Sequence, residues 1–158
     1  MEKESRCLGP RALKQLVGRR TVLIEVACSP ESRLTSMIQK LIGHEDAAIR
    51  CSHWNGCDLG TQAGVDMILN TIDTHRPEHV WISPNCGPYS PLQSINQRSE
   101  AQIAQLAEKR RVALQQYTGA KCVYEYCIQH GIHVTWEWSQ KCQGWRLPIM
   151  QDLSLIHI

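Results

Sequence analysis

Short, mostly apolar runs alternate with longer segments of helical periodicity along this chain, and this alternation most constrains its fold. The apolar runs occupy residues 21–27, 47–51, 80–83 and 132–136, and their pattern predicts buried strands. The segments between them are long enough to carry helices that join parallel strands by right-handed crossovers. The sequence therefore predicts an α/β fold with a mostly parallel sheet and helices on both faces.

Helical periodicity predicts three helices between these strands. The first begins at residues 29–31, where serine can cap the helix and proline and glutamate suit its first turn, and it runs to about Ile42. The second is predicted over residues 61–75 and the third over residues 100–130. Gly119 lies within the third helix and predicts an interruption or a kink there.

Apolar residues at helical spacing predict which faces of these helices are buried. They are Leu34, Met37, Ile38, Leu41 and Ile42 in the first helix, Val65, Ile68, Leu69 and Ile72 in the second, and Ile103, Leu106, Val112 and Leu114 in the third. We expect each set to pack against the sheet.

Size and composition place the chain among globular proteins of a single domain. Its 158 residues suffice for a real core, and the formal net charge of +2 implies no strongly charged partner overall. No run approaches ~18 apolar residues, so no membrane span is expected. The polar N-terminus is unlike a signal peptide, and eight cysteines without an export signal predict free thiols in a reducing intracellular compartment, nuclear or cytoplasmic.

The two ends of the chain differ from its middle. Residues 1–20 form a basic extension in which a short helix is predicted over residues 11–17. A second basic cluster covers residues 109–111, and both clusters are either phosphate contacts or solvated helix faces. The last six residues, 153–158, resemble translated adaptor sequence, so we interpret them as a non-native tail. We therefore expect an incomplete domain over residues 21–152 that is truncated at its C-terminus.

The segment 84–90, with the sequence Pro-Asn-Cys-Gly-Pro-Tyr-Ser, places a cysteine directly after the third predicted strand. Ligands and chemistry gather at the carboxyl edge of parallel α/β sheets. Prolines at 84, 88 and 91 stiffen this loop. Cys86 is therefore a candidate nucleophile. The alternative is that Cys86 is a small buried hydrophobic residue.

Other polar or reactive side chains also follow predicted strands. Cys28 and Ser29 follow the first strand, and Asp58 follows the second after a loop. Glu137 and Ser139 follow the fourth strand. Because the carboxyl ends of parallel strands share one edge of the sheet, we expect these side chains to converge with the Cys86 loop.

The segment 84–90 resembles the Pro-Pro-Cys-Gln-Pro-Phe-Ser loop of the DNA cytosine-5 methyltransferases. In that family the loop cysteine attacks the cytosine ring, and the covalent adduct accepts a methyl group from S-adenosylmethionine. The order of elements over residues 21–138 is similar to that of the family, which implies a three-layer, Rossmann-like methyltransferase fold. The resemblance assigns the nucleophile to Cys86 and, within Trp-Glu-Trp-Ser at 136–139, the contact to the target base to Glu137.

The resemblance also implies a cofactor site and a DNA partner. The implied residues for S-adenosylmethionine are Glu25, Ala27, Cys28, Ser29, Asp58 and Pro84. The residues expected to contact nucleic acid are Ser90, Arg98, Lys109, Arg110 and Arg111. A base would have to leave the DNA stack to reach such a pocket.

The chain departs from the family pattern at several positions. Asn85, Gly87 and Trp138 stand where the family has proline, glutamine and asparagine. The loop after the first strand has no glycine, the residue that lets a backbone approach a nucleotide closely. The family's later Gln-x-Arg-x-Arg motif and its target-recognition region are absent. We therefore expect a divergent or degenerate domain that does not methylate DNA in this form.

Two other functions remain open on the sequence. The chain is also similar to segments of algal retroelement-like polyproteins, which implies a non-catalytic domain of a mobile-element polyprotein. A zinc-stabilised nucleic-acid-binding module would use Cys51 and Cys57, or Cys122, Cys127, His130 and His133, although these spacings are poor for zinc. Ordinary structural roles also compete: Asp58 as a turn residue, and Glu137 as the ion-pair partner of an arginine such as Arg146.

Overall fold

The computed structural model describes residues 20–95 and 99–154 of the chain. The predicted helix over residues 11–17, the basic extension as far as Arg19 and the predicted phosphate contact Arg98 lie outside the described residues. Within those described ranges, no helix is both long and apolar enough to cross a membrane.

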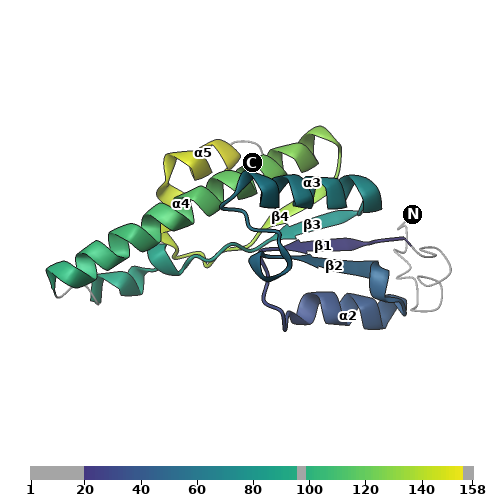
Figure 1. The fold of residues 1–158 in the computed structure, drawn as a ribbon, viewed down its shortest axis with the longest axis horizontal. Helices are drawn as coiled ribbons and strands as arrows, with labels where there is room; N and C mark the ends of the chain where they lie inside the picture. Colours follow the sequence, from purple (N-terminus) through teal and green to yellow (C-terminus); the bar gives the residue numbers. More distant parts are fainter. Residues whose placement is uncertain (1–19, 96–98, 155–158) are drawn as a thin grey trace, which may run out of the picture.

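A sheet of four parallel strands forms the centre of the molecule (Figure 1). The strands are β1 (Leu23–Val26), β2 (Ala48–Cys51), β3 (His79–Ile82) and β4 (His133–Trp136), and their order across the sheet is β2-β1-β3-β4. Every neighbouring pair is parallel. The predicted α/β class and the four predicted strands are confirmed.

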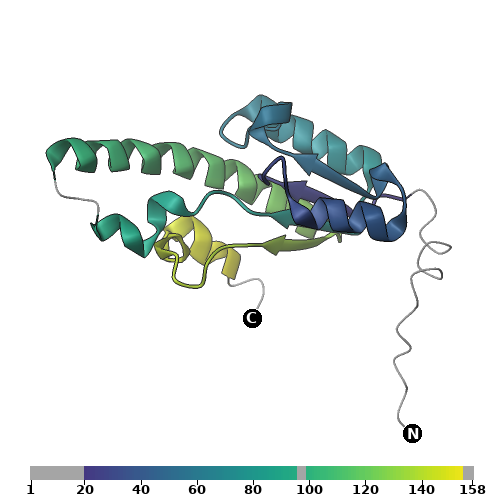
Figure 2. The same cartoon turned by 90° about the horizontal axis from the view of Figure 1, so that it is seen from below.

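Helices lie on both sides of this sheet (Figures 1 and 2). Helix α2 (Arg33–Ile42) packs against β1 and β2 on one face. Helices α3 (Gln62–His75) and α4 (Glu100–Gln129) pack against each other on the opposite face, where α4 contacts β3 and β4. The short helix α5 (Pro148–Ser154), which was not predicted, packs beside α4.

The main core lies between the sheet and the layer of α3, α4 and α5. Alternate residues of β1 and β3 point into it because successive side chains of a strand face opposite sides. Its fully buried members include Ile24, Val26, Ile68, Ile72, Val80, Ile82, Val123 and Cys127. Leu153, the first residue of the predicted non-native tail, is also buried in this core.

Helix α2 begins later than predicted, and only part of its predicted apolar face is covered: Ile42 is buried, and Leu34 and Ile38 are half-buried. Its N-cap is Ser32 rather than Ser29, and it starts at Arg33. The predicted core residue Met37 is 68% exposed and Leu41 is also exposed, whereas the polar Thr35 is buried. The prediction was wrong for Met37 and Leu41, because the face of the sheet beneath α2 carries the buried carboxylate of Glu25 and the helix turns Thr35 toward it.

Helix α4 is one continuous helix of 30 residues, so the predicted interruption at Gly119 is wrong. Gly119 instead faces the backbone of Leu59, where a side chain would collide with a carbonyl group. The N-terminal half of α4 projects beyond the carboxyl edge of the sheet (Figures 1 and 2). Of its predicted core residues, Leu106 is buried, but Ile103 is 51% exposed because no part of the sheet lies beneath it. Val112 and Leu114 are exposed as well.

Candidate functional site

A crevice of about 260 Å³ lies at the carboxyl edge of the sheet, next to the point where the strand order reverses. From β1 the chain passes to β2 on one side and later to β3 on the other side, so the loops after β1 and β3 diverge. Such a switch point is the usual ligand site of an open α/β sheet. Residues 27–29, 52–53 and 57–59 line the crevice, together with Asn85 and Gln116.

The loop after β1 forms one wall of the crevice. Ala27 has a φ of 60°, an uncommon conformation for a residue with a side chain. The Cys28 carbonyl accepts a hydrogen bond of 2.7 Å from the Ser52 hydroxyl, which ties the loops after β1 and β2 together. Burial, and secondarily the Glu25 carboxylate, raises the pKa of Cys28 to about 11, so this thiol stays protonated. The buried Cys28 forms part of the wall of the crevice.

Asp58 lines the crevice and also organises the turn before α3. Its Oδ1 accepts a hydrogen bond of 2.9 Å from the Gly60 amide. Gly64, in the first turn of α3, packs so closely on the Asp58 backbone that a side chain there would overlap it. The two predicted roles of Asp58, a turn residue and a ligand contact, are thus compatible at one position.

Glu25 does not line the crevice. It is 5% exposed and faces α2, between core residues that face the other way. Its carboxylate accepts hydrogen bonds from the hydroxyls of Ser32, at 2.6 and 2.7 Å, and of Thr35, at 2.6 Å. The Thr35 amide, in the first turn of α2, donates a further bond of 3.2 Å. Glu25 therefore anchors the start of α2 to β1, and this anchor explains why α2 buries Thr35.

The Cys86 loop is held at its backbone by side chains from distant parts of the chain. The Trp138 indole donates to the Pro84 carbonyl at 2.7 Å, and the Tyr117 hydroxyl donates to the Asn85 carbonyl at 2.7 Å. Arg110 donates to the Pro88 carbonyl at 3.1 Å. These bonds fix the loop from α4 and from the segment after β4, and they leave Cys86 half-buried beside the crevice wall.

Side chains of Tyr117, Trp138, Cys142 and Trp145 form a cluster that packs against this loop. Trp138 lies against Tyr117 at 4.7 Å between ring centroids and against Trp145 at 5.1 Å. The buried Cys142 places its sulfur 3.9 Å from the Cys86 carbonyl oxygen. Sequence reasoning missed Tyr117, Trp138 and Cys142 as supports of the site. Nothing local identifies them, because each contacts the loop across at least 32 residues of chain.

Glu137 lies away from this cluster. Its Oε2 accepts a hydrogen bond of 2.8 Å from the indole of Trp81, which lies on the side of β3 opposite to Val80 and Ile82. Trp81 is therefore on the sheet face opposite α4, whereas Cys86 packs with Tyr117 of α4. Within the part of the chain that the structure describes, Glu137 forms no ion pair with an arginine.

The predicted nucleic-acid contacts fall into two groups. Arg110 and Ser90 are used within the loop region: Arg110 lies over the Tyr89 ring at 5.2 Å from its centroid, and the Ser90 Oγ accepts from a nearby amide at 3.3 Å. Lys109 and Arg111 are exposed on the projecting half of α4, and Arg111 pairs with Glu108 at 2.7 Å.

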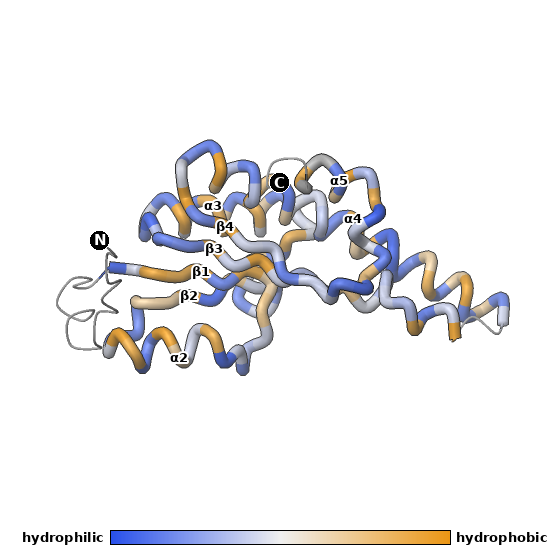
Figure 3. Tube along the Cα trace, turned by 180° about the vertical axis from the view of Figure 1, so that it is seen from behind, coloured by the Kyte–Doolittle hydropathy of each residue, from blue (hydrophilic) through white to orange (hydrophobic). Residues whose placement is uncertain are grey.

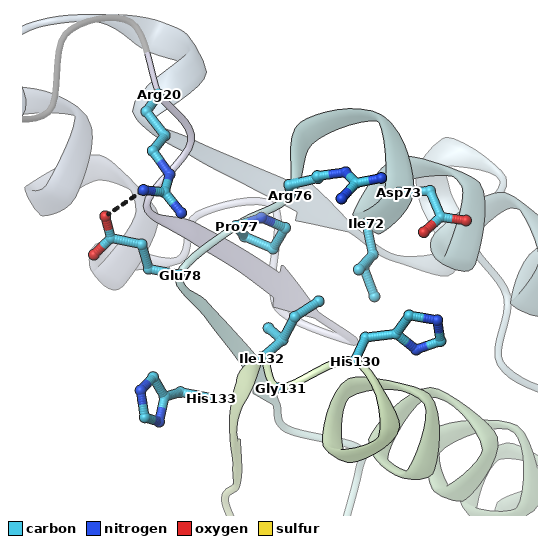
Figure 4. A pocket seen from close by; sticks show the side chains of 10 residues that line it. All are labelled: Arg20, Ile72, Asp73, Arg76, Pro77, Glu78, His130, Gly131, Ile132 and His133. Atoms are coloured by element: carbon cyan, nitrogen blue, oxygen red, sulfur yellow. Dashed lines mark ion pairs between the residues drawn. The ribbon is translucent and has the colours of Figure 1, made fainter.

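A larger cavity of about 500 Å³ lies at the opposite, amino edge of the sheet (Figure 4). Acidic and basic side chains both line this cavity: Asp73 and Glu78 are acidic, and Arg20 and Arg76 are basic. The carbonyl-rich C-terminal ends of α3 and α4 also meet there. Basic side chains at helix C-termini have an ordinary structural role, so this cavity is the weaker candidate despite its size.

A metal centre is not indicated by the geometry. Cys122 is exposed and Cys127 is fully buried, so these two thiols of α4 face different surroundings. Among the described residues, no three His, Cys, Asp or Glu side chains are arranged to hold a metal ion.

In comparisons with family models, curated proteins and solved structures, nothing matches the chain.

Proposed function

We propose that this chain is a divergent, three-layer Rossmann-like domain of the DNA cytosine-5 methyltransferase type that binds S-adenosylmethionine at the carboxyl-edge crevice. One observation carries the proposal: Ala27, Cys28, Ser29 and Asp58, all predicted cofactor residues, line one crevice with Asn85 of the nucleophile loop. Their convergence at a switch point is what a nucleoside cofactor requires.

The chemistry of the crevice suits a nucleoside. Asp58 Oδ1 and Ser29 Oγ each accept from one backbone amide, and the remaining hydrogen-bonding capacity of these side chains suits ribose hydroxyls. The Asn85 Oδ1 accepts from the Gly87 amide, so its NH2 group, with the side-chain amide of Gln116, would meet a base edge. The volume of about 260 Å³ is slightly below the ~300 Å³ at which small-molecule sites usually begin. We therefore expect weak binding of the whole cofactor.

Cys86 is the proposed nucleophile for the target base. Bound cofactor would supply an electrophilic methyl group. The protein would supply a rigid thiol, because hydrogen bonds from Tyr117 and Trp138 hold the loop on either side of Cys86 and reduce the cost of positioning it. Glu137, bonded to Trp81, would have to exchange that partner to contact a base. This difference supports a degenerate rather than a fully active site.

DNA is the proposed partner. The projecting half of α4 adjoins the Cys86 loop through Arg110 and presents Lys109 and Arg111 to solvent. Side chains of this kind contact phosphates, and such contacts weaken steeply as salt rises. A base extruded from the duplex would then enter beside Cys86.

Titration calorimetry with S-adenosylmethionine tests the proposal. Replacing a carboxylate that accepts a ligand hydrogen bond costs about 2 kcal/mol, so Asp58→Asn should weaken binding by about thirtyfold. Asp66→Asn is the matched control, because Asp66 is exposed on α3 and bonds only to Gln62 among the contacts described. Absence of heat with the wild-type protein, or equal affinity in both variants, contradicts the proposal.

The covalent step needs its own test. DNA that contains 5-fluorocytosine, incubated with S-adenosylmethionine, should form a stable adduct with the wild-type protein, slowly and at the low yield of a degenerate site, and none with Cys86→Ser. Cys122→Ser is the control, since Cys122 is an exposed thiol on α4 that lies outside the crevice. An adduct that persists in Cys86→Ser removes Cys86 from the mechanism.

A second candidate function is that of a non-catalytic interaction domain. It is favoured by apolar side chains near the projecting tip of α4, where Leu92 is 66% exposed and Ile95 and Ile103 are also exposed. Figure 3 shows apolar residues recurring along this projecting part. If this is the function, Leu92→Ser and Ile103→Ser should reduce self-association measured by light scattering, and the crevice variants should not.

A further inference from the structure

The cysteines of this protein differ sharply in their surroundings. Among the described residues, Cys28, Cys51, Cys57, Cys127 and Cys142 are buried, Cys86 is half-buried and Cys122 is exposed. An accessible thiol with a second thiol beside it can be oxidised to a disulfide, whereas an isolated or deeply buried thiol cannot react in that way. Cys86 is the accessible thiol of such a pair, and Cys142 is the thiol beside it.

The side chain of Cys142 packs against the Cys86 loop. Its sulfur lies 3.9 Å from the carbonyl oxygens of both Cys86 and Tyr89, and the Gly144 amide donates to it at 3.3 Å. Both cysteines pack with Tyr117 in one cluster. The 3.9 Å contact and the shared cluster place the Cys142 thiol directly against Cys86. Burial raises the pKa of Cys142, and interaction with the Cys86 thiol contributes to the same shift.

The fold, not the local sequence, brings the two thiols together. Cys86 and Cys142 are 56 residues apart, but they follow β3 and β4, which are adjacent parallel strands. The bond from Trp138 to the Pro84 carbonyl ties the two loops directly. The two thiols therefore lie on loops that are held against each other at the carboxyl edge of the sheet.

We propose that Cys86 and Cys142 form a peroxide-sensitive thiol pair that closes reversibly to a disulfide. The Cys86 thiol gives up its proton, its sulfur attacks one oxygen of hydrogen peroxide and the O–O bond breaks; the hydroxide that leaves takes up the proton, which yields a sulfenic acid and water. The Cys142 sulfur then attacks the Cys86 sulfur, the S–O bond breaks and a second water leaves with the thiol proton. Two thiols thus lose two electrons to one peroxide, and a dithiol reductant reverses the change.

The order of these steps follows from access. Cys86 is half-buried and meets peroxide first, whereas Cys142 is buried and reacts only with its neighbour. The consequence for activity rests on the proposed function: a disulfide would remove the Cys86 nucleophile. The disulfide itself does not depend on cofactor binding.

Peptide mapping tests the pair directly. After treatment with hydrogen peroxide and alkylation, digestion with trypsin and Asp-N separates the relevant cysteines. Cys86 falls in peptide 73–98 and Cys142 in peptide 142–146. Residues 51–57 hold Cys51 and Cys57, and residues 122–141 hold Cys122 and Cys127. We expect a link between peptides 73–98 and 142–146 that disappears after dithiothreitol. Alkylation of both Cys86 and Cys142 after peroxide, or a link from Cys86 to another peptide, overturns the proposal.

Two variants sharpen the result. Cys142→Ser should abolish the link and leave a Cys86 sulfenic acid that dimedone traps, whereas Cys122→Ser should leave the link intact. Loss of the link in Cys122→Ser overturns the proposal, and the wild-type map decides it even if Cys142→Ser does not fold. Calorimetry on the same wild-type protein separates the proposals, because a linked pair without cofactor heat rejects only the methyltransferase function.

Discussion

The two edges of the sheet differ in how their loops are held. At the carboxyl edge, the crevice walls are joined by long-range hydrogen bonds, such as the buried one from Ser52 to Cys28 and the partly buried one from Tyr117 to Asn85. At the amino edge, the larger cavity is bordered by an exposed ion pair of 3.7 Å between Arg20 and Glu78. Exposed pairs of this kind contribute little to stability. The long-range hydrogen bonds that hold its walls therefore distinguish the carboxyl-edge crevice as the candidate site, although the amino-edge cavity has the larger volume.

The largest effect is expected when a methyl group is added where the carboxyl-edge loop meets α4. Gly119→Ala should destabilise the protein by about 3 kcal/mol, because the new Cβ would collide with the Leu59 carbonyl, which is backbone and cannot rotate away. Gly131→Ala at the amino edge meets open space and is strained only by a φ of +67°, so it should cost about 1 kcal/mol. Urea unfolding measures both values, and equal losses would remove the contrast between the edges.

The next largest effect on stability is expected when the carboxylates of Glu25 and Glu78 are compared. Glu25→Gln should lower the free energy of unfolding by about 2 kcal/mol, because a buried charge that accepts several hydrogen bonds is lost. Glu78→Gln should change it by about 0.5 kcal/mol or less, since its ion pair with Arg20 is exposed. Thermal unfolding of both variants tests the comparison, and a larger loss in Glu78→Gln would reverse it.

A matched pair of tyrosines gives a smaller effect. Tyr117→Phe removes the hydroxyl that holds the Cys86 loop and should cost about 1 kcal/mol. It should also speed the reaction of Cys86 with a thiol reagent. Tyr126→Phe removes an exposed hydroxyl that bonds to Asp73 at the amino-edge cavity, and we expect no measurable change. Unaltered Cys86 reactivity in Tyr117→Phe would show that the loop is held by other contacts.

The smallest effect is a pH dependence near the amino edge. Burial, and secondarily His133, lowers the pKa of His79 at the start of β3. The unfolded chain therefore binds more protons as pH falls below about 6.5, so stability present above that value is lost through the folded-state pKa. His79→Gln should flatten this loss in urea midpoints taken at about pH 7.5 and about pH 5.5. If the urea midpoint falls equally between these two pH values in the wild type and in His79→Gln, His79 is not the source of the pH dependence.

The strand–helix alternation was predictable from local patterns. All four strands lie within about two residues of their predicted bounds, and α3 begins after the N-cap Thr61 as expected. These elements depend on hydrophobic periodicity and capping, which are local properties of the sequence. The convergence of Cys28, Ser29 and Asp58 was also predictable, because parallel strands bring their carboxyl ends to one edge.

Failures occurred where a distant partner decides the outcome. Met37 is exposed and Thr35 is buried because Glu25, on a neighbouring strand, bonds to the polar side of α2. The Trp81 indole and the carboxylate of Glu137 are likewise paired across the sheet at a separation of 56 residues. Local periodicity carries no record of such pairs.

The sequence by itself determined the class of the fold, the order of its elements and the position of Cys86 after a strand, since these follow from local hydrophobic pattern and turn residues. Only the tertiary structure decided which side chains surround that cysteine. It placed Cys142 beneath the loop and Tyr117 across it, because strand adjacency and helix packing join segments far apart in the chain.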